Sequence, residues 1–383
     1  MYKERGITPH LKKMLKKFPI ISLTGPRQTG KTTLLRNEFK DYKYFNLERP
    51  DLRELIIGDP LGFLRNNGKK IIFDEAQNLP ELFSYIQADS DESNLVGKYI
   101  LSGSQSFLLN EKISQSLAGR VSVNILLPFD FSEYPKLKSS SVEELILSGF
   151  YPRLHESKIN YSDFYPSYLQ TYIERDLRTL SGIENLNTFS RFLSLCAGRV
   201  GQILNLSSLA NDCGVSVNTA KSWISLLEAS YIVYLLQPFH KSFNKRIIKS
   251  PKLYFYDTGV VSSLLRISNK EMLRSHYLYG ALFENFVISE VIKKKYHSGT
   301  QPSVYYWRES NGTEIDCIIE GGNNRLYAIE LKGGETFNND FLRNLKIFEN
   351  LQKDIPIKSK VIYNGEIKSK ISGIEIMNWR DYL

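Results

Sequence analysis

The sequence has few of the residues that mark disulfide-linked, zinc-binding or membrane proteins. It contains only 3 cysteines and 5 histidines in 383 residues. The cysteines Cys196, Cys213 and Cys317 are far apart, which argues against a disulfide framework and a structural zinc site. No apolar run approaches the roughly 18 residues that span a bilayer, and the first residues carry charges where a signal peptide would be apolar. We therefore expect reduced thiols, no membrane contact and a cytoplasmic location.

An excess of negative charge is also missing. Lys and Arg number 50 against 41 Asp and Glu, which gives a formal net charge of +9. With 42% hydrophobic and 24% charged residues, the composition is that of a folded soluble protein of two or three domains. The positive balance favours polyanions such as DNA as partners but does not require one, because lysine-rich proteins that never bind nucleic acid show a similar balance.

A glycine-rich loop is the strongest motif in the chain. Residues 23–33 read LTGPRQTGKTT, between an apolar run expected to be a strand and a leucine-containing stretch expected to be a helix. That order of strand, loop and helix separates a GxxxxGK[ST] phosphate-binding loop from a chance match. A simple Gly-Pro turn would explain Gly25 and Pro26 but would leave Gly30, Lys31 and Thr32 unexplained. We expect the phosphates of a nucleotide to be bound by Gly25, Pro26, Arg27, Gln28, Thr29, Gly30, Lys31, Thr32 and Thr33.

Two of these residues have roles beyond binding. Lys31 can reach the β and γ oxygens and so take part in catalysis, and the Thr32 hydroxyl is placed to hold Mg²⁺ at the amino end of the helix.

Polar residues follow two further predicted strands. The run IIFDEAQ ends in Asp74 and Glu75, and KYILSGSQ ends near Ser104. In nucleotide triphosphatases the acid at such a strand end orders Mg²⁺, and a following glutamate can polarise the attacking water. Asp74 is thus the expected metal ligand, Glu75 the expected general base, and Ser104 a candidate sensor of the γ phosphate. The alternatives are that the acids cap the next helix and that Ser104 lies in a small-residue turn.

The motifs together match one family. They are LTGPRQTGKTTLL, IIFDEAQNLP, ILSGSQ, SLAGRV with LPFDFSEY, YLQTYIERDL, SPKLYFYDTG, GALFENFV, and TEIDCII with AIELKGG. The chain resembles the bacterial and archaeal AAA-type ATPases that join a phosphate-loop domain to a carboxyl-terminal domain of unknown function, and the resemblance runs from about residue 19 to residue 335. It implies an α/β P-loop NTPase fold with a parallel sheet in the order 5-1-4-3-2, and ATP as the nucleotide.

In such ATPases an arginine reaches the γ phosphate, from the same subunit or from a neighbour in a homo-oligomer. We favour Arg120, which precedes a predicted fifth strand, VSVNILL. Arg153 and Arg175 are the other candidates, and each of the three could instead form a salt bridge.

A DNA-binding module is expected after the ATPase region. In residues 204–239 two short helices flank a Cys-Gly-Val turn, which is the layout of a helix-turn-helix. The stretch that follows has five basic residues and no acid, typical of the wing of a winged helix: Lys241, Lys245, Arg246, Lys249 and Lys252. Such a fold can also serve as a lid or a protein-docking module, so contact with DNA stays one of two readings.

The last part of the chain carries a second set of catalytic residue types. Asp316, Glu330 and Lys332 follow a D-x13-E-x-K pattern, and Glu330 and Lys332 leave the same face of a predicted strand. This pattern resembles the PD-(D/E)XK nuclease fold, in which two carboxylates bind Mg²⁺ and the lysine positions or deprotonates a water. Glu284, on a preceding helix expected to be amphipathic, could complete the site. A charged pair on an exposed strand is the alternative.

The expected organisation has four parts. They are a P-loop ATPase domain at 1–135, a helical lid or linker at 136–200, a winged helix at 201–265 and an α/β nuclease-like domain at 266–383. Two functions remain open on the sequence. The chain is either an ATP-driven enzyme acting on DNA, or a nucleotide-dependent switch that binds a protein partner and cuts nothing.

Overall fold

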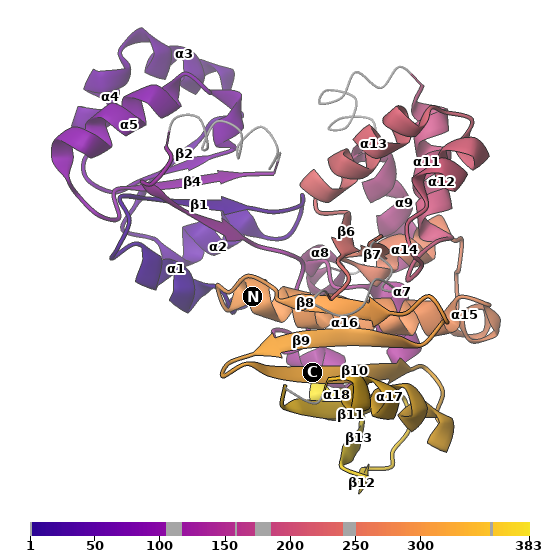
Figure 1. Cartoon of the computed structure of the whole chain (residues 1–383). Helices are drawn as coiled ribbons and strands as arrows, with labels where there is room; N and C mark the ends of the chain where they lie inside the picture. The colour runs from indigo at the N-terminus through magenta and orange to yellow at the C-terminus, as the bar shows by residue number, and fades with distance from the viewer. Residues whose placement is uncertain (1, 105–116, 158, 173–184, 240–249, 353–354) are drawn as a thin grey trace.

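The protein combines a parallel α/β sheet, a helical part and a mixed sheet (Figure 1). The computed structural model describes residues 2–104, 117–157, 159–172, 185–239, 250–352 and 355–383. Within them no helix is both long and apolar enough to cross a bilayer. The three cysteines, Cys196, Cys213 and Cys317, are buried and free.

The first sheet has five parallel strands in the order β2-β3-β4-β1-β5, which confirms the expected 5-1-4-3-2 order of a P-loop NTPase. Alternate residues of β1 pack on opposite faces of the sheet: Ile20 lies in one apolar cluster, and Ile21 lies in another with Leu34 and Leu35 of α2. Parallel pairing brings the carboxyl ends of the strands to one edge, where a ligand site forms. The strands are β1 Ile20–Thr24, β2 Lys43–Asn46, β3 Ile71–Asp74, β4 Tyr99–Gly103 and β5 Val121–Ile125.

Helices cover both faces of this sheet (Figure 1). They are α1 Thr8–Met14, α2 Lys31–Glu38, α3 Pro50–Gly58, α4 Pro60–Asn67, the 3-10 turn Ala76–Asn78 and α5 Leu82–Ser93.

The middle of the chain is mainly helical, as expected. Its helices are α7 Val142–Ser148, α8 Pro152–Glu156, α9 Tyr161–Tyr172, α11 Leu186–Ala197, α12 Leu206–Cys213, α13 Val217–Ala229, α14 Thr258–Leu264 and α15 Lys270–Ser275, preceded by a 3-10 turn, Pro135–Ser139. The two antiparallel strands β6 Val233–Leu236 and β7 Lys252–Phe255 follow α12 and α13, which is the order of elements expected for a winged helix. The assignment as a DNA-binding winged helix and the four domain boundaries stay predictions.

One residue of the predicted basic wing was misassigned. Lys252 is almost completely buried, in contact with two carboxylates, because it begins β7 inside the molecule. Lys241, Lys245, Arg246 and Lys249 lie outside the described residues.

The carboxyl-terminal part is a six-stranded mixed sheet in the order β12-β13-β11-β10-β9-β8, preceded by the long helix α16, Tyr279–His297. Its strands are β8 Val304–Arg308, β9 Glu314–Gly321, β10 Arg325–Lys332, β11 Ile357–Tyr363, β12 Ser369–Ile371 and β13 Ile374–Asn378, with the 3-10 turn Asn339–Leu342 and the helices α17 Arg343–Leu351 and α18 Trp379–Tyr382.

The helix α16 is not amphipathic, contrary to expectation. Residues 285–293 are all buried, because α16 contacts β5 of the first sheet, β7 and α7 of the helical part, and β10 of the mixed sheet. A helix that packs on several sides has no solvent face to keep polar.

Candidate functional site

The glycine loop after β1 makes a turn that only glycine allows at two positions. Gly25 has φ +147°, and a Cβ there would lie 2.1 Å from the Leu126 carbonyl oxygen. Gly30, with φ +90°, immediately precedes α2, and no side chain caps that helix end. The loop therefore presents the amino end of α2, whose N–H groups and dipole favour a phosphate.

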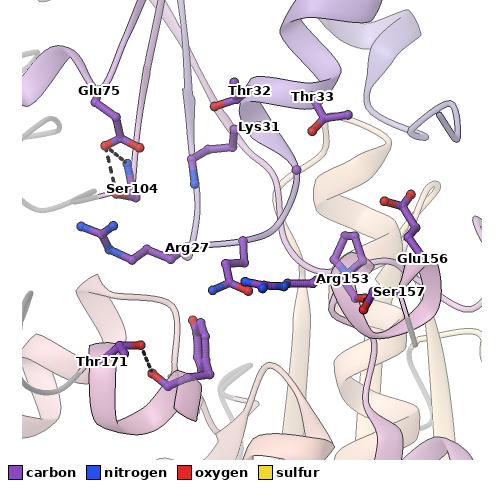
Figure 2. Close-up of a pocket in the computed structure, with 14 residues that line it drawn as sticks. Arg27, Lys31, Thr32, Thr33, Glu75, Ser104, Arg153, Glu156, Ser157 and Thr171 are labelled. Atoms are coloured by element: carbon purple, nitrogen blue, oxygen red, sulfur yellow. Dashed lines mark hydrogen bonds between the residues drawn. The ribbon is translucent and has the colours of Figure 1, made fainter. Parts of the chain in front are cut away.

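Lys31 lies against this loop. Its ammonium donates hydrogen bonds to the carbonyl oxygens of Gly25 (2.9 Å) and Pro26 (2.8 Å), and the residue is 5% exposed. Figure 2 shows the lysine on the inner side of the loop, facing the pocket. This places the only lysine of the loop where its charge faces the pocket.

Asp74, at the end of β3, meets the first turn of α2. Its Oδ2 accepts hydrogen bonds from the Thr32 hydroxyl (2.6 Å) and the Tyr44 hydroxyl (2.5 Å), and its Oδ1 accepts one from Ser102. The carboxylate is buried but fully hydrogen-bonded, as a buried charge must be. Thr32 and Asp74 thus come together as expected, and a hydroxyl beside a carboxylate is a donor set that suits Mg²⁺.

Glu75 faces Ser104 across the same edge of the sheet (Figure 2). Its Oε2 accepts hydrogen bonds from the Ser104 hydroxyl (3.0 Å), the Ser104 amide (3.2 Å) and the Gln77 side chain (2.6 Å). The Glu75 backbone is left-handed, with φ +53°, a conformation that costs a non-glycine residue about 1–2 kcal/mol. Glu75 does not cap the helix that follows, so the capping alternative is wrong for this residue.

These residues line one pocket of about 660 Å³. On one side are Arg27, Gln28, Gly30, Lys31, Thr32, Thr33, Glu75 and Ser104, and on the other are Pro152, Arg153, Glu156, Ser157, Tyr168 and Thr171. The second group comes from α8, α9 and the residue after α8, so the helical part forms the opposite wall. Figure 2 shows Arg153 extending from that wall toward the loop.

The three arginine candidates are placed differently. Arg120 immediately precedes β5, at the edge of the sheet opposite the phosphate loop, and forms a bidentate ion pair with Asp91 (2.5 and 2.9 Å). The five residues of β5 span about 16 Å, which keeps Arg120 away from the phosphates of its own subunit. Arg153 lines the pocket. Arg175 lies outside the described residues, and a role for Arg120 in a neighbouring subunit stays a prediction.

The carboxylates of the mixed sheet also meet. In the pairing of β9 with β10, Ile329 lies opposite Cys317, which brings Glu330 next to Asp316. The Lys332 ammonium lies 2.7 Å from Glu330 Oε1 and 3.6 Å from Asp316 Oδ2. Asp316 Oδ2 also accepts a hydrogen bond from the Leu331 amide (2.8 Å), while Glu330 Oε2 is buried without a hydrogen-bonding partner among the described residues.

Burial and charge set the proton affinities at this site. Burial, together with the nearby Asp316 carboxylate, raises the pKa of Glu330 to about 8. Burial opposes the charge of Lys332, but Asp316 and Glu330 outweigh it and raise its pKa. The site therefore holds its lysine charged and favours the protonated form of Glu330.

Glu284 is engaged by a second lysine. Its Oε1 lies 3.1 Å from the Lys252 ammonium and accepts a hydrogen bond from the Tyr254 hydroxyl, and Lys252 also pairs closely with Glu314. Burial raises the pKa of Glu284 to about 7, against the opposing effect of Lys252. In the described part of the chain, Glu284 does not form a three-residue cluster with Asp316 and Glu330 in which all ligand atoms lie within 4.8 Å of one another.

Three residues at these sites escaped the sequence interpretation. The Tyr44 hydroxyl donates a hydrogen bond to Asp74, and the Gln77 side chain donates one to Glu75. Of these two residues, Gln77 could have been found from its position in the DEAQ motif, whereas Tyr44 has no such signal. Arg5 donates a hydrogen bond to the carbonyl of Thr29 in the phosphate loop (2.7 Å). Nothing in the sequence around Arg5 signals this contact.

One group of three side chains has its potential metal-binding atoms within 4.8 Å of one another: Asp130, Glu133 and His297. Arg5 already pairs with Glu133 (3.1 Å), and the imidazole contacts both acids. The negative charge is thus balanced by side chains, and we assign this group as an ion-pair network rather than a metal site.

Comparison with known proteins identifies the family. Rv2008c of Mycobacterium tuberculosis, described as an uncharacterized protein, is 30% identical over 343 residues, which are 88% of this chain and 75% of that protein. The chain belongs to the family of Rv2008c. A more distant relative is the uncharacterized protein MJ1544 of Methanocaldococcus jannaschii, 24% identical over 91% of this chain and 83% of its own.

Family models divide this member of the Rv2008c family into three regions. Residues 17–135 match an AAA domain, residues 139–271 the domain of unknown function DUF8612, and residues 279–382 the domain of unknown function DUF4143. A solved Walker-type ATPase of Pyrococcus abyssi, PABY2304, is similar over 70% of this chain and 96% of its own, with 16% identity and a TM-score of 0.46. The sheet order and the AAA match together show an AAA-type ATPase domain with the P-loop NTPase fold.

Proposed function

We propose that the AAA domain binds ATP with Mg²⁺ and hydrolyses it in the pocket between the phosphate loop and α8. One observation carries the proposal: Lys31, Thr32, Glu75 and Arg153 line the same pocket of about 660 Å³. These are the residue types that bind phosphates, hold a metal, activate water and stabilise charge on a transferred phosphoryl group.

The residues divide the work as follows. The amino end of α2 and Lys31 bind the β and γ phosphates, and Thr32 with Asp74 would hold Mg²⁺, which supplies neutralising charge when bound. Glu75 accepts a proton from the attacking water as the water oxygen bonds to the γ phosphorus. The bond from that phosphorus to the β–γ bridging oxygen breaks, and ADP leaves with the electron pair. Ser104 orients Glu75 through the hydrogen bonds on its Oε2.

Two substitutions separate binding from hydrolysis. Lys31→Ala should abolish ATP binding, because the loop loses its only lysine, whereas Glu75→Gln should keep binding and reduce hydrolysis by roughly a hundredfold or more. Binding is measured by calorimetry and hydrolysis by phosphate release. Lys43→Ala, which changes an exposed lysine on β2, is the control and should match the wild type in both. Equal loss of affinity in the Lys31 and Glu75 variants would remove the role given to Glu75.

A second candidate function concerns DNA and the DUF4143 region. The orphaned Glu330 Oε2 beside Asp316 suits a divalent cation, and a metal held there with Lys332 nearby would support Mg²⁺-dependent cleavage of a phosphodiester. The opposing observation is that Lys332 already pairs with Glu330 and Lys252 with Glu284, which favours a nucleotide-dependent switch that binds a protein partner. Salt-dependent retention on a DNA column separates the two, because phosphate contacts weaken steeply as salt rises.

A further inference from the structure

Arg5 lies behind the phosphate loop and contacts it directly. Its guanidinium donates hydrogen bonds to the carbonyl oxygens of Thr29 (2.7 Å) and Leu127 (2.8 Å). A Cβ on Gly30 would lie 3.9 Å from Arg5 Nη1, so the arginine packs under the residue that precedes α2. Arg5 is 3% exposed, and a buried guanidinium in several directed hydrogen bonds has one orientation.

Glu133 fixes Arg5 from the other side. One carboxylate oxygen accepts from Arg5 Nε (3.1 Å) and from the Gly6 amide (2.6 Å), and the other lies 3.1 Å from Arg5 Nη2. His297, the last residue of α16, contacts Glu133 Oε2 (3.2 Å) and Asp130 Oδ2 (2.8 Å) through Nδ1. Figure 1 shows the amino terminus beside α16, in agreement with these contacts.

The helix α16 also makes two hydrogen bonds with residues 129–131, which precede Glu133 in the chain. Lys293 donates to the Phe129 carbonyl (2.8 Å), and Glu290 accepts from the Phe131 amide (2.6 Å). Near its other end α16 carries Glu284, which binds Lys252 and Tyr254 beside the carboxylates of the mixed sheet. Glu284 and His297 are 13 positions apart on α16, which is about 20 Å of helix at ~1.5 Å per residue.

We propose that Arg5 is a positioning residue for the phosphate loop, and that α16 of the DUF4143 region sets its position through the contacts of His297 with Glu133. The inference rests on the proposed nucleotide binding at the loop. His297 does not line the pocket, and its contact with Glu133, which holds Arg5, gives it a path to the loop. Nucleotide binding and the packing of the carboxyl-terminal region are then linked.

The test measures the affinity for ATP by calorimetry in the full chain. Arg5→Gln should weaken ATP binding by about tenfold or more, and His297→Gln by severalfold. The control is Lys98→Met, which removes a largely buried ion pair with Asp89 (2.5 Å) at the opposite edge of the same sheet and should leave the affinity unchanged. Thermal unfolding of each variant reports whether it is folded.

The double variant decides whether the two residues act in one chain of contacts. If His297 acts through Arg5, Arg5→Gln with His297→Gln should bind ATP no more weakly than Arg5→Gln alone, whereas Lys98→Met with Arg5→Gln should lower the melting temperature by the sum of the two separate changes. Arg5→Lys keeps the positive charge but loses the planar guanidinium that makes several directed hydrogen bonds, so it should bind ATP little better than Arg5→Gln does.

A wild type that binds no ATP would refute the proposed function itself. Wild-type affinity in folded Arg5→Gln or His297→Gln protein would overturn the inference alone, and additive losses of affinity in the double variant would overturn the connection through Arg5.

Discussion

Arg153 is the candidate arginine that shares the pocket with the phosphate loop. It lies on α8, in the DUF8612 region, yet lines the same cavity as Lys31 and Glu75 of the AAA domain. An arginine so placed can stabilise charge that develops on the γ phosphate within one subunit. The sequence-based preference for Arg120 could not account for this, because the direction of β5 and the Asp91 partner depend on tertiary contacts.

Replacing these two arginines should have different effects. Arg153→Ala should reduce the rate of ATP hydrolysis by roughly a hundredfold with a smaller change in affinity, because the guanidinium acts mainly on the transition state. Arg120→Ala should leave hydrolysis by an isolated subunit unchanged. The measurement is steady-state phosphate release at several protein concentrations. Full activity of Arg153→Ala would argue against its role. Loss of activity in Arg120→Ala that is recovered by mixing with Glu75→Gln protein would instead indicate an arginine supplied by a neighbouring subunit.

Other residues show why a sequence predicts some sites better than others. Lys31 and Thr32, at the start of α2, and Asp74 and Glu75, at the end of β3, could be located from the sequence because each lies in a motif whose local order fixes its place. The partners of Arg5 could not, since Thr29 and Glu133 lie 24 and 128 residues away. Lys252 was assigned to an exposed basic run for the same reason, because the acids that bury it come from α16 and β9.

At the scale of elements, the strands β1, β3 and β4 of the AAA sheet were predicted well because buried parallel strands are short apolar runs. The prediction failed for α16, whose residues 285–293 are buried on all sides. Its periodicity suggested one polar face, but Glu290 and Lys293 pair with each other inside the protein. From the sequence alone, two charged residues that pair inside the protein cannot be distinguished from charged residues on the exposed face of a helix.

The carboxyl end of α16 gives a prediction about pH. His297 faces Asp130, Glu133 and Arg5; burial and Arg5 lower its pKa, but the two acids outweigh them and the net shift is upward from 6.5. A histidine whose pKa is raised on folding stabilises the protein fully below its unfolded value, and this contribution disappears as the pH rises through the folded value. The stability advantage of the wild type over His297→Gln should therefore be largest near about pH 6 and shrink toward about pH 9.

Denaturant unfolding of both proteins across this range measures the effect. Glu284 and Glu290, each with its pKa raised to about 7, and Glu330, raised to about 8, also destabilise the fold as they lose protons. That decline is common to both proteins, so only the difference between them reports on His297. A difference in unfolding free energy that is constant over the range would show that folding does not shift the pKa of His297.

At the scale of the whole molecule, the helical part and the helix α16 of the carboxyl-terminal region both border the AAA domain. Arg153, from the helical part, lines the pocket beside the phosphate loop, and α16 reaches the phosphate loop through Glu133 and Arg5. The motifs predicted two separate chemical sites, but not the contacts that join them. Such contacts leave no local pattern, because each of their residues reads as an ordinary charged side chain.

The last prediction asks whether the carboxylate site is a metal site. Asp316 and Glu330 lie on adjacent strands, and the buried Glu330 Oε2 lacks a hydrogen-bonding partner among the described residues, so Mn²⁺ or Mg²⁺ should bind both acids with Lys332 left beside the water. Asp316→Asn should then abolish calorimetric Mn²⁺ binding at this site and any metal-dependent nicking of plasmid DNA. ATP hydrolysis should stay within about twofold of the wild type, because Asp316 does not line the pocket beside the phosphate loop.

Glu320→Gln, at the far end of the same strand β9, is the matched control and should retain both metal binding and nicking. Nicking that survives in Asp316→Asn protein would assign the cleavage to a contaminant. If the wild type binds no Mn²⁺ at this site, Lys332 is the cation that the described residues pair with both Asp316 and Glu330. A carboxylate pair without a metal cannot generate the hydroxide that attacks a phosphodiester at neutral pH. The DUF4143 region would then act through its ion pairs and surface contacts, and the chain would act as a nucleotide-dependent switch.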